Sequence, residues 1–329
     1  MKKLSSGLFN AIKIIIGITL LVASLWGIDW NRIFSTISTI GITWLLLTIA
    51  SVFISLGLKV LRWYLLLWDY GIQVSFVQTA SSFFLGQASN IILPVRGGEV
   101  VRFGWLRSQK DRGAAEIVTT IGIEKVLDLM FFLVLSFLIT AFIPIQEIQK
   151  NTVGLAISGA ILTLVMVVAI WFMPGIWQSY RNNIQIKIPA RVQSSFVRFD
   201  RWISECKLVR QPRYLLPIIA ITFLTWVVML ATNLFLLKAF NLPILVVAGA
   251  LVLVAIYVGV LPALMPGNIG PFIFFANLAL APFGFDPQVR VAYSILLQGI
   301  VTIPPLVLAG LFVIFSRLSV AHVGYQKTL

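Results

Sequence analysis

Long apolar runs are the feature that most constrains the fold of this chain. Each run approaches or exceeds the roughly 20 residues that a helix needs to cross a bilayer. Only 11% of the 329 residues are charged, whereas a soluble domain has about 25%. The sequence therefore predicts an all-α, polytopic membrane bundle of seven to eight spans. Seven long runs are expected to cross, at 8–26, 43–58, 117–142, 153–173, 215–237, 244–265 and 289–315, and 268–283 is a candidate short or broken eighth crossing.

The basic residues set the expected topology. The formal charge of +14 is concentrated between the apolar runs, where it favours a cytoplasmic loop and contact with anionic lipid over nucleic-acid binding. Segment 175–213 carries eight Lys or Arg residues against two acids, and its part 192–206 is a candidate surface-lying amphipathic helix. We interpret 8–26 as an uncleaved helix. We expect a multi-pass protein of the plasma (inner) membrane with a cytoplasmic N-terminus.

The stretch from 87 to 107 breaks one of the apolar runs. It ends a helix-like segment at Pro94, turns at Gly97 and Gly98, and resumes with Glu99 and Arg102. Backbone outside a helix is tolerated at membrane depth only where it is buried in protein or lines a wet cavity. Because a full crossing at 75–94 would put the following cations outside, we expect this segment to be re-entrant or interfacial.

A second break occupies a corresponding position later in the chain. We expect one integral membrane domain over 1–329, with a first half at about 1–174, the basic loop at 175–213, and a second half at about 214–329. Paired Gly/Pro interruptions in two halves are typical of a transporter site at a repeat interface. The alternative is that these residues only kink membrane helices. The second break comprises Pro266, Gly267, Asn268 and Gly270.

Charged residues inside the apolar runs form a third pattern. Glu124 and Asp128 lie four apart, so a helix places them on one face, with Lys125 about 100° away. Intramembrane carboxylates normally face the bundle interior and are paired. The candidate cations are Lys59, Arg62, Arg96 and Arg102. The pairs either stabilise the fold or shape a headgroup pocket or proton relay.

The sequence gives little support for catalysis. It has one cysteine and one histidine, so we expect no internal disulfide, no Cys/His metal cluster, no cofactor and no catalytic set. The surplus of cations near the first break favours direct phosphate binding over a metal bridge, and arginine suits this geometry. The candidate headgroup-binding residues are Lys59, Arg62, Asn90, Arg96, Glu99 and Arg102.

Three stretches have a recognisable pattern: GLKVLRWYLLL from Gly57, NIILPVRGGEVVRFGWLR from Asn90, and EKVLD from Glu124. Together they resemble the transmembrane region of lysylphosphatidylglycerol synthases and related flippase-like proteins. The resemblance implies movement of lipids between leaflets. In the second half the family pattern places a glutamate where this chain has Ile273, which disfavours a lysyl-lipid substrate. The chain also ends at Leu329 without an aminoacyl-transferase region, so we expect it not to synthesise the lysyl lipid.

Three functions follow as hypotheses. The first is a lipid translocator for an anionic phospholipid or a polyprenyl-linked lipid. The second is an accessory subunit that presents lipid to a glycosyltransferase or another lipid-modifying enzyme. The third is an enzyme that acts on lipid phosphate.

Overall fold

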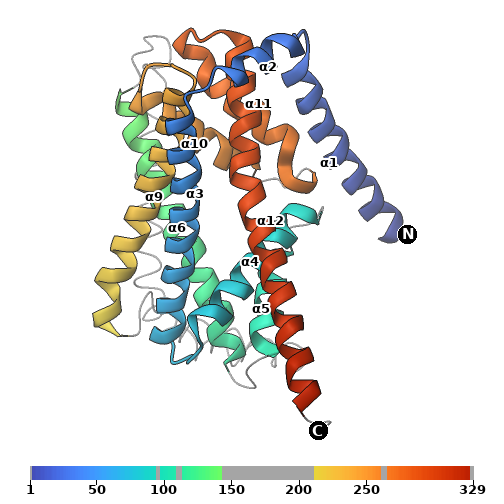
Figure 1. The fold of residues 1–329 in the computed structure, drawn as a ribbon, viewed down its shortest axis with the longest axis vertical. Helices are drawn as coiled ribbons and strands as arrows, with labels where there is room; N and C mark the ends of the chain where they lie inside the picture. Colours follow the sequence, from blue (N-terminus) through green and yellow to red (C-terminus); the bar gives the residue numbers. More distant parts are fainter. Residues whose placement is uncertain (1, 94–96, 109–112, 143–210, 261–264, 327–329) are drawn as a thin grey trace, which may run out of the picture. The chain divides into compact units, whose positions relative to one another are not determined.

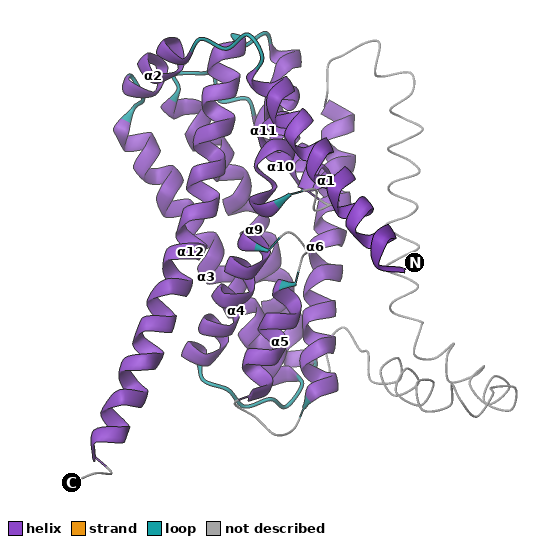
Figure 2. Cartoon of the chain, turned by 90° about the vertical axis from the view of Figure 1, so that its right-hand side faces the viewer, coloured by secondary structure: helices purple, strands orange, loops and turns teal. Residues whose placement is uncertain are grey.

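A computed structural model describes residues 2–93, 97–108, 113–142, 211–260 and 265–326. All the regular secondary structure in these residues is helical (Figure 2), which confirms the all-α prediction for this part of the chain. The expected span 153–173, the predicted surface helix 192–206 and nearly all of the basic segment 175–213 lie outside the described residues.

The described helices follow one another along the chain as Figure 1 labels them. The first half contains α1 (Lys2–Leu25), α2 (Trp30–Ser38), α3 (Ile42–Asp69), α4 (Phe76–Ile92), α5 (Gly98–Ser108) and α6 (Ala114–Phe142). The second contains α9 (Pro212–Ala239), α10 (Val246–Val260), α11 (Ile269–Leu280) and α12 (Pro287–Gln326), with 3₁₀ turns η1 (Pro266–Asn268) and η2 (Ala281–Phe283).

Three helices in the described part of the chain are long and apolar enough to cross a membrane. They are α3, α9 and the part of α12 from Pro287 to Phe315. Part of α1 (Ile12–Leu25) and α2 pass the same test together, bent by 75°, so the number rises to at most four. The predicted seven to eight spans are not confirmed. Helix α10 has only 15 residues, and α6 carries four charged residues, Glu116, Glu124, Lys125 and Asp128.

Helix α3 continues well past the end predicted for it. The sequence suggested a span at 43–58 that stops before Lys59, but the helix runs to Asp69 and is followed by Gly71 at φ 79°. Within this longer helix, Arg62 is fully buried and ion-paired.

The described residues form parts of two compact units. Unit 1 contains 1–60, 75–109 and 224–329, and unit 2 contains 61–74 and 110–223. Within unit 1, α11 packs against α1, α10 and α12, while α4 packs against α5 and α12. The contact between α1 and α11 is close, because a Cβ on Gly270 would meet the backbone oxygen of Gly17.

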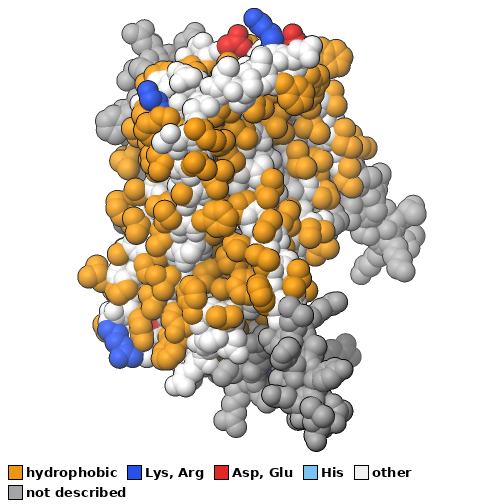
Figure 3. Space-filling view, in the orientation of Figure 1, with side chains coloured by type: hydrophobic (Ala, Val, Ile, Leu, Met, Phe, Trp, Pro, Cys, Tyr) orange, Lys and Arg blue, Asp and Glu red, His pale blue; other side chains and the backbone are white. Residues whose placement is uncertain are grey.

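Large apolar side chains remain exposed along the candidate spans. Leu46 on α3, Phe223 on α9 and Phe315 on α12 are 59%, 58% and 63% exposed. Hydrophobic side chains also cover much of the face drawn in Figure 3. Soluble monomers rarely expose contiguous apolar surface on this scale, so these faces are suited to lipid.

Candidate functional site

The first break separates α4 from α5 at the place that the sequence predicted. Helix α4 ends at Ile92, and Leu93 is already extended, with φ −82° and ψ 139°. Pro94 and Arg96 lie outside the described residues. The chain is helical again from Gly98, and the two helices pack against each other (Figure 1). The break is therefore a helical hairpin.

Two glycines and one amide hold this hairpin together. The backbone N–H of Gly98 donates to Oδ1 of Asn90 at 2.8 Å. A Cβ on Gly98 would meet the backbone oxygen of Gly86 and the Asn90 side chain, so no larger residue fits at either crossing point. Asn90, a predicted headgroup residue, therefore uses this oxygen to satisfy an N–H at the start of α5.

Arg102 lies buried inside the hairpin. It is 5% exposed, and its guanidinium carbon is 5.0 Å from the centroid of the Phe83 ring. The backbone oxygen of Arg102 accepts a hydrogen bond from Oγ of Ser82 at 2.7 Å. Glu99 lies half-buried in the first turn of α5, where its negative charge complements the helix dipole. The hairpin thus holds a cation against an aromatic face.

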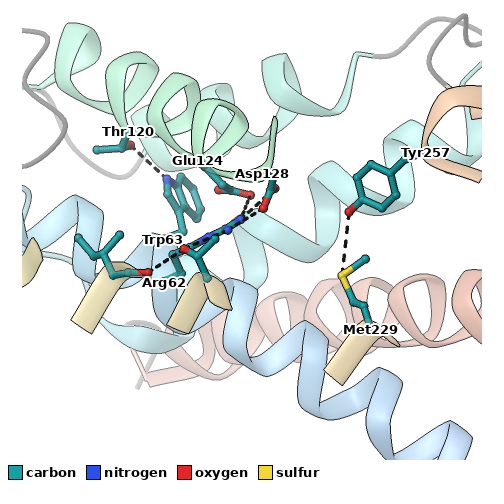
Figure 4. Close-up of polar contacts among 9 residues, drawn as sticks. Arg62, Trp63, Thr120, Glu124, Asp128, Met229 and Tyr257 are labelled. Carbon is teal, nitrogen blue, oxygen red and sulfur yellow. Dashed lines mark hydrogen bonds and ion pairs between the residues drawn. The ribbon is translucent and has the colours of Figure 1, made fainter. Parts of the chain in front are cut away.

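A second charged group lies in unit 2. Arg62 on α3 is completely buried and forms a fork-to-fork pair with Asp128 on α6, through Nη1 to Oδ1 at 2.7 Å and Nη2 to Oδ2 at 3.0 Å. Its Nη2 is also 3.5 Å from Oε1 of Glu124. Figure 4 shows the guanidinium pointing toward both carboxylates. An ion pair with two parallel hydrogen bonds is stronger than one with a single hydrogen bond.

Neutral groups support the same arginine. Trp63 donates from Nε1 to Oγ1 of Thr120 at 3.1 Å, which joins α3 to α6 (Figure 4). Nη1 of Arg62 lies 3.5 Å from Oγ1 of Thr222 on α9. Lys125 is exposed, as the helical spacing predicted. Sequence analysis did not identify Thr222 as a neighbour of Arg62. The only sign of it in the sequence is a hydroxyl side chain inside an apolar run.

The predicted site residues fall into two local groups. Asn90, Gly98 and Arg102 meet in unit 1, where Glu99 belongs to the same hairpin and half-buried Lys59 lies on α3. Arg62, Glu124 and Asp128 meet in unit 2. Four cations were candidates to pair with Glu124 and Asp128. In the described residues, Arg62 contacts both carboxylates.

The second break lies at η1. Gly267 and Asn268 have positive φ values of 66° and 50°, and α11 begins at Ile269. The backbone oxygen of Gly267 accepts a hydrogen bond from Nε2 of Gln298 on α12 at 3.0 Å. η1 also packs against α4, and a Cβ on Gly267 would lie 3.8 Å from the backbone oxygen of Ile91. The second break therefore packs against the C-terminal end of α4, the helix that precedes the first break, inside unit 1.

Gln298 is a functional candidate that sequence reasoning did not find. It is 7% exposed and bonds to backbone that has left the helix. The signal in the sequence is an amide within the otherwise apolar run 289–315. Ile273, at the position of the missing acid, lies on α11 and is 5% exposed.

Comparisons with known proteins agree with the resemblance. The family model described as "Lysylphosphatidylglycerol synthase TM region" matches residues 10–309. The chain is also 28% identical over 164 residues to the UPF0104 membrane protein PH1989 of Pyrococcus horikoshii, an alignment that covers 48% of each chain. The matched region thus spans about half the length of that curated relative.

Proposed function

The chain belongs to the lysylphosphatidylglycerol synthase transmembrane-region family, and from this premise we propose that it is a lipid translocator. Its substrate is an anionic phospholipid or a polyprenyl-linked lipid. The observation that carries this proposal is the packing of the second break, at η1, against the end of α4, the helix that leads into the first break. Broken helices that meet in this way are a recurrent way to build a transport site within a membrane.

The charges at the first break support an anionic headgroup. We assign phosphate contact to Arg96 and Arg102, with Lys59 as a further cation and Glu99 orienting them. Arginine binds phosphate through two parallel hydrogen bonds. Arg62 contributes to the fold instead, because Asp128 and Glu124 already neutralise it. Buried Ile273 supplies no counter-charge for an ammonium headgroup.

The proposed topology has seven to eight crossings of the plasma membrane, with the N-terminus, residues 107–112 and segment 175–213 in the cytoplasm. An Arg191→Cys variant, in a background that lacks Cys206, should resist an impermeant thiol reagent added to intact cells and react after permeabilisation. The reason is the positive-inside bias of an eight-cation loop. Strong labelling in intact cells would place this segment outside the cytoplasm and contradict the proposed orientation.

The substrate class can be tested by lipid identification. Protein purified gently and analysed by mass spectrometry should retain anionic or polyprenyl-phosphate lipid above its share in the source membrane. The enrichment is expected because two arginines pair with the phosphate of either lipid, but the ammonium of a zwitterionic headgroup opposes their positive charge. A bound pool with the composition of the bulk membrane would contradict the assignment.

A further inference from the structure

Two amide oxygens at the second break are buried without a hydrogen-bond donor. They are Oδ1 of Asn268 and Oε1 of Gln298, and neither accepts a hydrogen bond from the described residues. Gln298 is 7% exposed. Buried polar atoms in native proteins nearly always have a partner, and two such acceptors at one turn make it a candidate contact for a bound group that supplies positive charge or a donor.

The orientation of the Gln298 amide is fixed by its neighbours. Its Nε2 donates to the backbone oxygen of Gly267 at 3.0 Å and to Oγ1 of Thr302 at 3.0 Å. Because the Gly267 oxygen can only accept a hydrogen bond, the Gln298 amide must direct its Nε2 toward it. Oε1 of Gln298 is therefore the amide atom without a hydrogen-bond partner. Asn268 follows Gly267 directly, so the second unsatisfied oxygen belongs to the adjacent residue.

The surrounding backbone is also rich in acceptors. Helix α4 ends at Ile92, and the backbone oxygen of Ile91 lies 3.8 Å from where a Gly267 Cβ would be. The last carbonyls of a helix have no intrahelical donor and carry the negative end of its dipole. The C-terminal end of α4 and two side-chain oxygens therefore approach the same turn.

We propose that this turn binds one small monovalent cation of the size of Na⁺, with Oδ1 of Asn268 and Oε1 of Gln298 among its ligands. Hard cations take oxygen ligands, and divalent ions such as Ca²⁺ and Mg²⁺ are usually held by carboxylates. No cluster of three acidic, His or Cys residues occurs in the described chain. Neutral oxygens at unwound backbone are typical of Na⁺ sites in transporters. The binding of this ion does not depend on the proposed function. A coupling of the ion to lipid transfer rests on the proposed function.

The test is a thermal-shift titration of the purified full-length protein in detergent, without added lipid. NaCl is exchanged for N-methylglucamine chloride at constant ionic strength, because that organic cation is too large for the turn. We expect Na⁺ at roughly ten times its dissociation constant to raise Tm by about 2 °C.

Asn268→Gly is the decisive variant. Glycine adopts the positive φ of this position without strain, so the variant removes the oxygen and keeps the fold. It should lose the Na⁺ shift, as should Gln298→Ala. Asn277→Ala is the matched control, since Asn277 has a buried Oδ1 without a donor about 13 Å further along α11 at ~1.5 Å per residue, and it should keep the shift.

Two results would overturn the cation site. The first is an equal Tm in both salts for the wild type, which would mean that the turn holds only a trapped water. The second is a Na⁺ shift that persists in both Asn268→Gly and Gln298→Ala. Because no transport is measured, either result leaves the lipid-translocation proposal to be judged separately.

Discussion

Replacing Arg62 with alanine is expected to lower the free energy of unfolding by about 3–5 kcal/mol, because it leaves buried Glu124 and half-buried Asp128 without their cation. Arg62 is 0% exposed and contacts both Asp128 and Glu124. The yield of folded Arg62→Ala protein after detergent extraction should fall as well. Tm of the purified variant, compared with wild type in the same detergent, measures the effect.

Lys125→Ala is the matched control for this prediction. Lys125 lies on α6 between the two carboxylates but is exposed, and surface charges contribute about 0–1 kcal/mol. The triple variant Arg62→Leu, Glu124→Leu and Asp128→Leu should recover part of the loss, since apolar replacement of a whole buried ionic group is often neutral or stabilising. If Arg62→Ala melts like Lys125→Ala, the pair does not stabilise the fold.

Replacing Arg102 with alanine is expected to weaken binding of anionic lipid about tenfold or more. A hydrogen bond to a charged group contributes roughly 1.5–3 kcal/mol, and every 1.4 kcal/mol is a tenfold change in affinity. Native mass spectrometry with added phosphatidylglycerol, together with thermal shift, measures the binding. The variant should still fold, because the hydrogen bond from Ser82 goes to the backbone of Arg102.

Arg102→Lys separates charge from geometry. It keeps a cation near the Phe83 ring but lacks the planar fork, so we expect intermediate affinity. Arg107→Ala, in the last turn of the same helix α5, should bind lipid like the wild type. Wild-type binding by Arg102→Ala would remove Arg102 from the headgroup site.

The sequence was sufficient to predict the breaks because their causes are local. Pro94 cannot donate a backbone hydrogen bond, and Gly97 and Gly98 permit a turn. The structure has α4 and α5 on either side of this stretch. Helical spacing likewise placed Glu124 and Asp128 on one face, where both meet Arg62.

Other features depend on packing that no local pattern reveals. The sequence offered four cations for the carboxylates, and in the described residues Arg62 on α3 contacts both of them on α6. Helix α3 also continues beyond the predicted span 43–58, to Asp69. Gln298 was missed because its partner is a backbone oxygen 31 residues away, at Gly267. A single amide in an apolar run does not identify such a partner.

Leaflet transfer by the purified protein tests the central claim most directly. Proteoliposomes carry phosphatidylglycerol labelled with a nitrobenzoxadiazole fluorophore in both leaflets, and dithionite added outside reduces only the outer label. With wild-type protein, we predict that the inner-leaflet signal also decays, because the lipid is moved outward, and that Arg102→Ala slows this decay. An inner-leaflet signal as stable as in protein-free liposomes, under imposed ion gradients of either direction, would contradict lipid translocation.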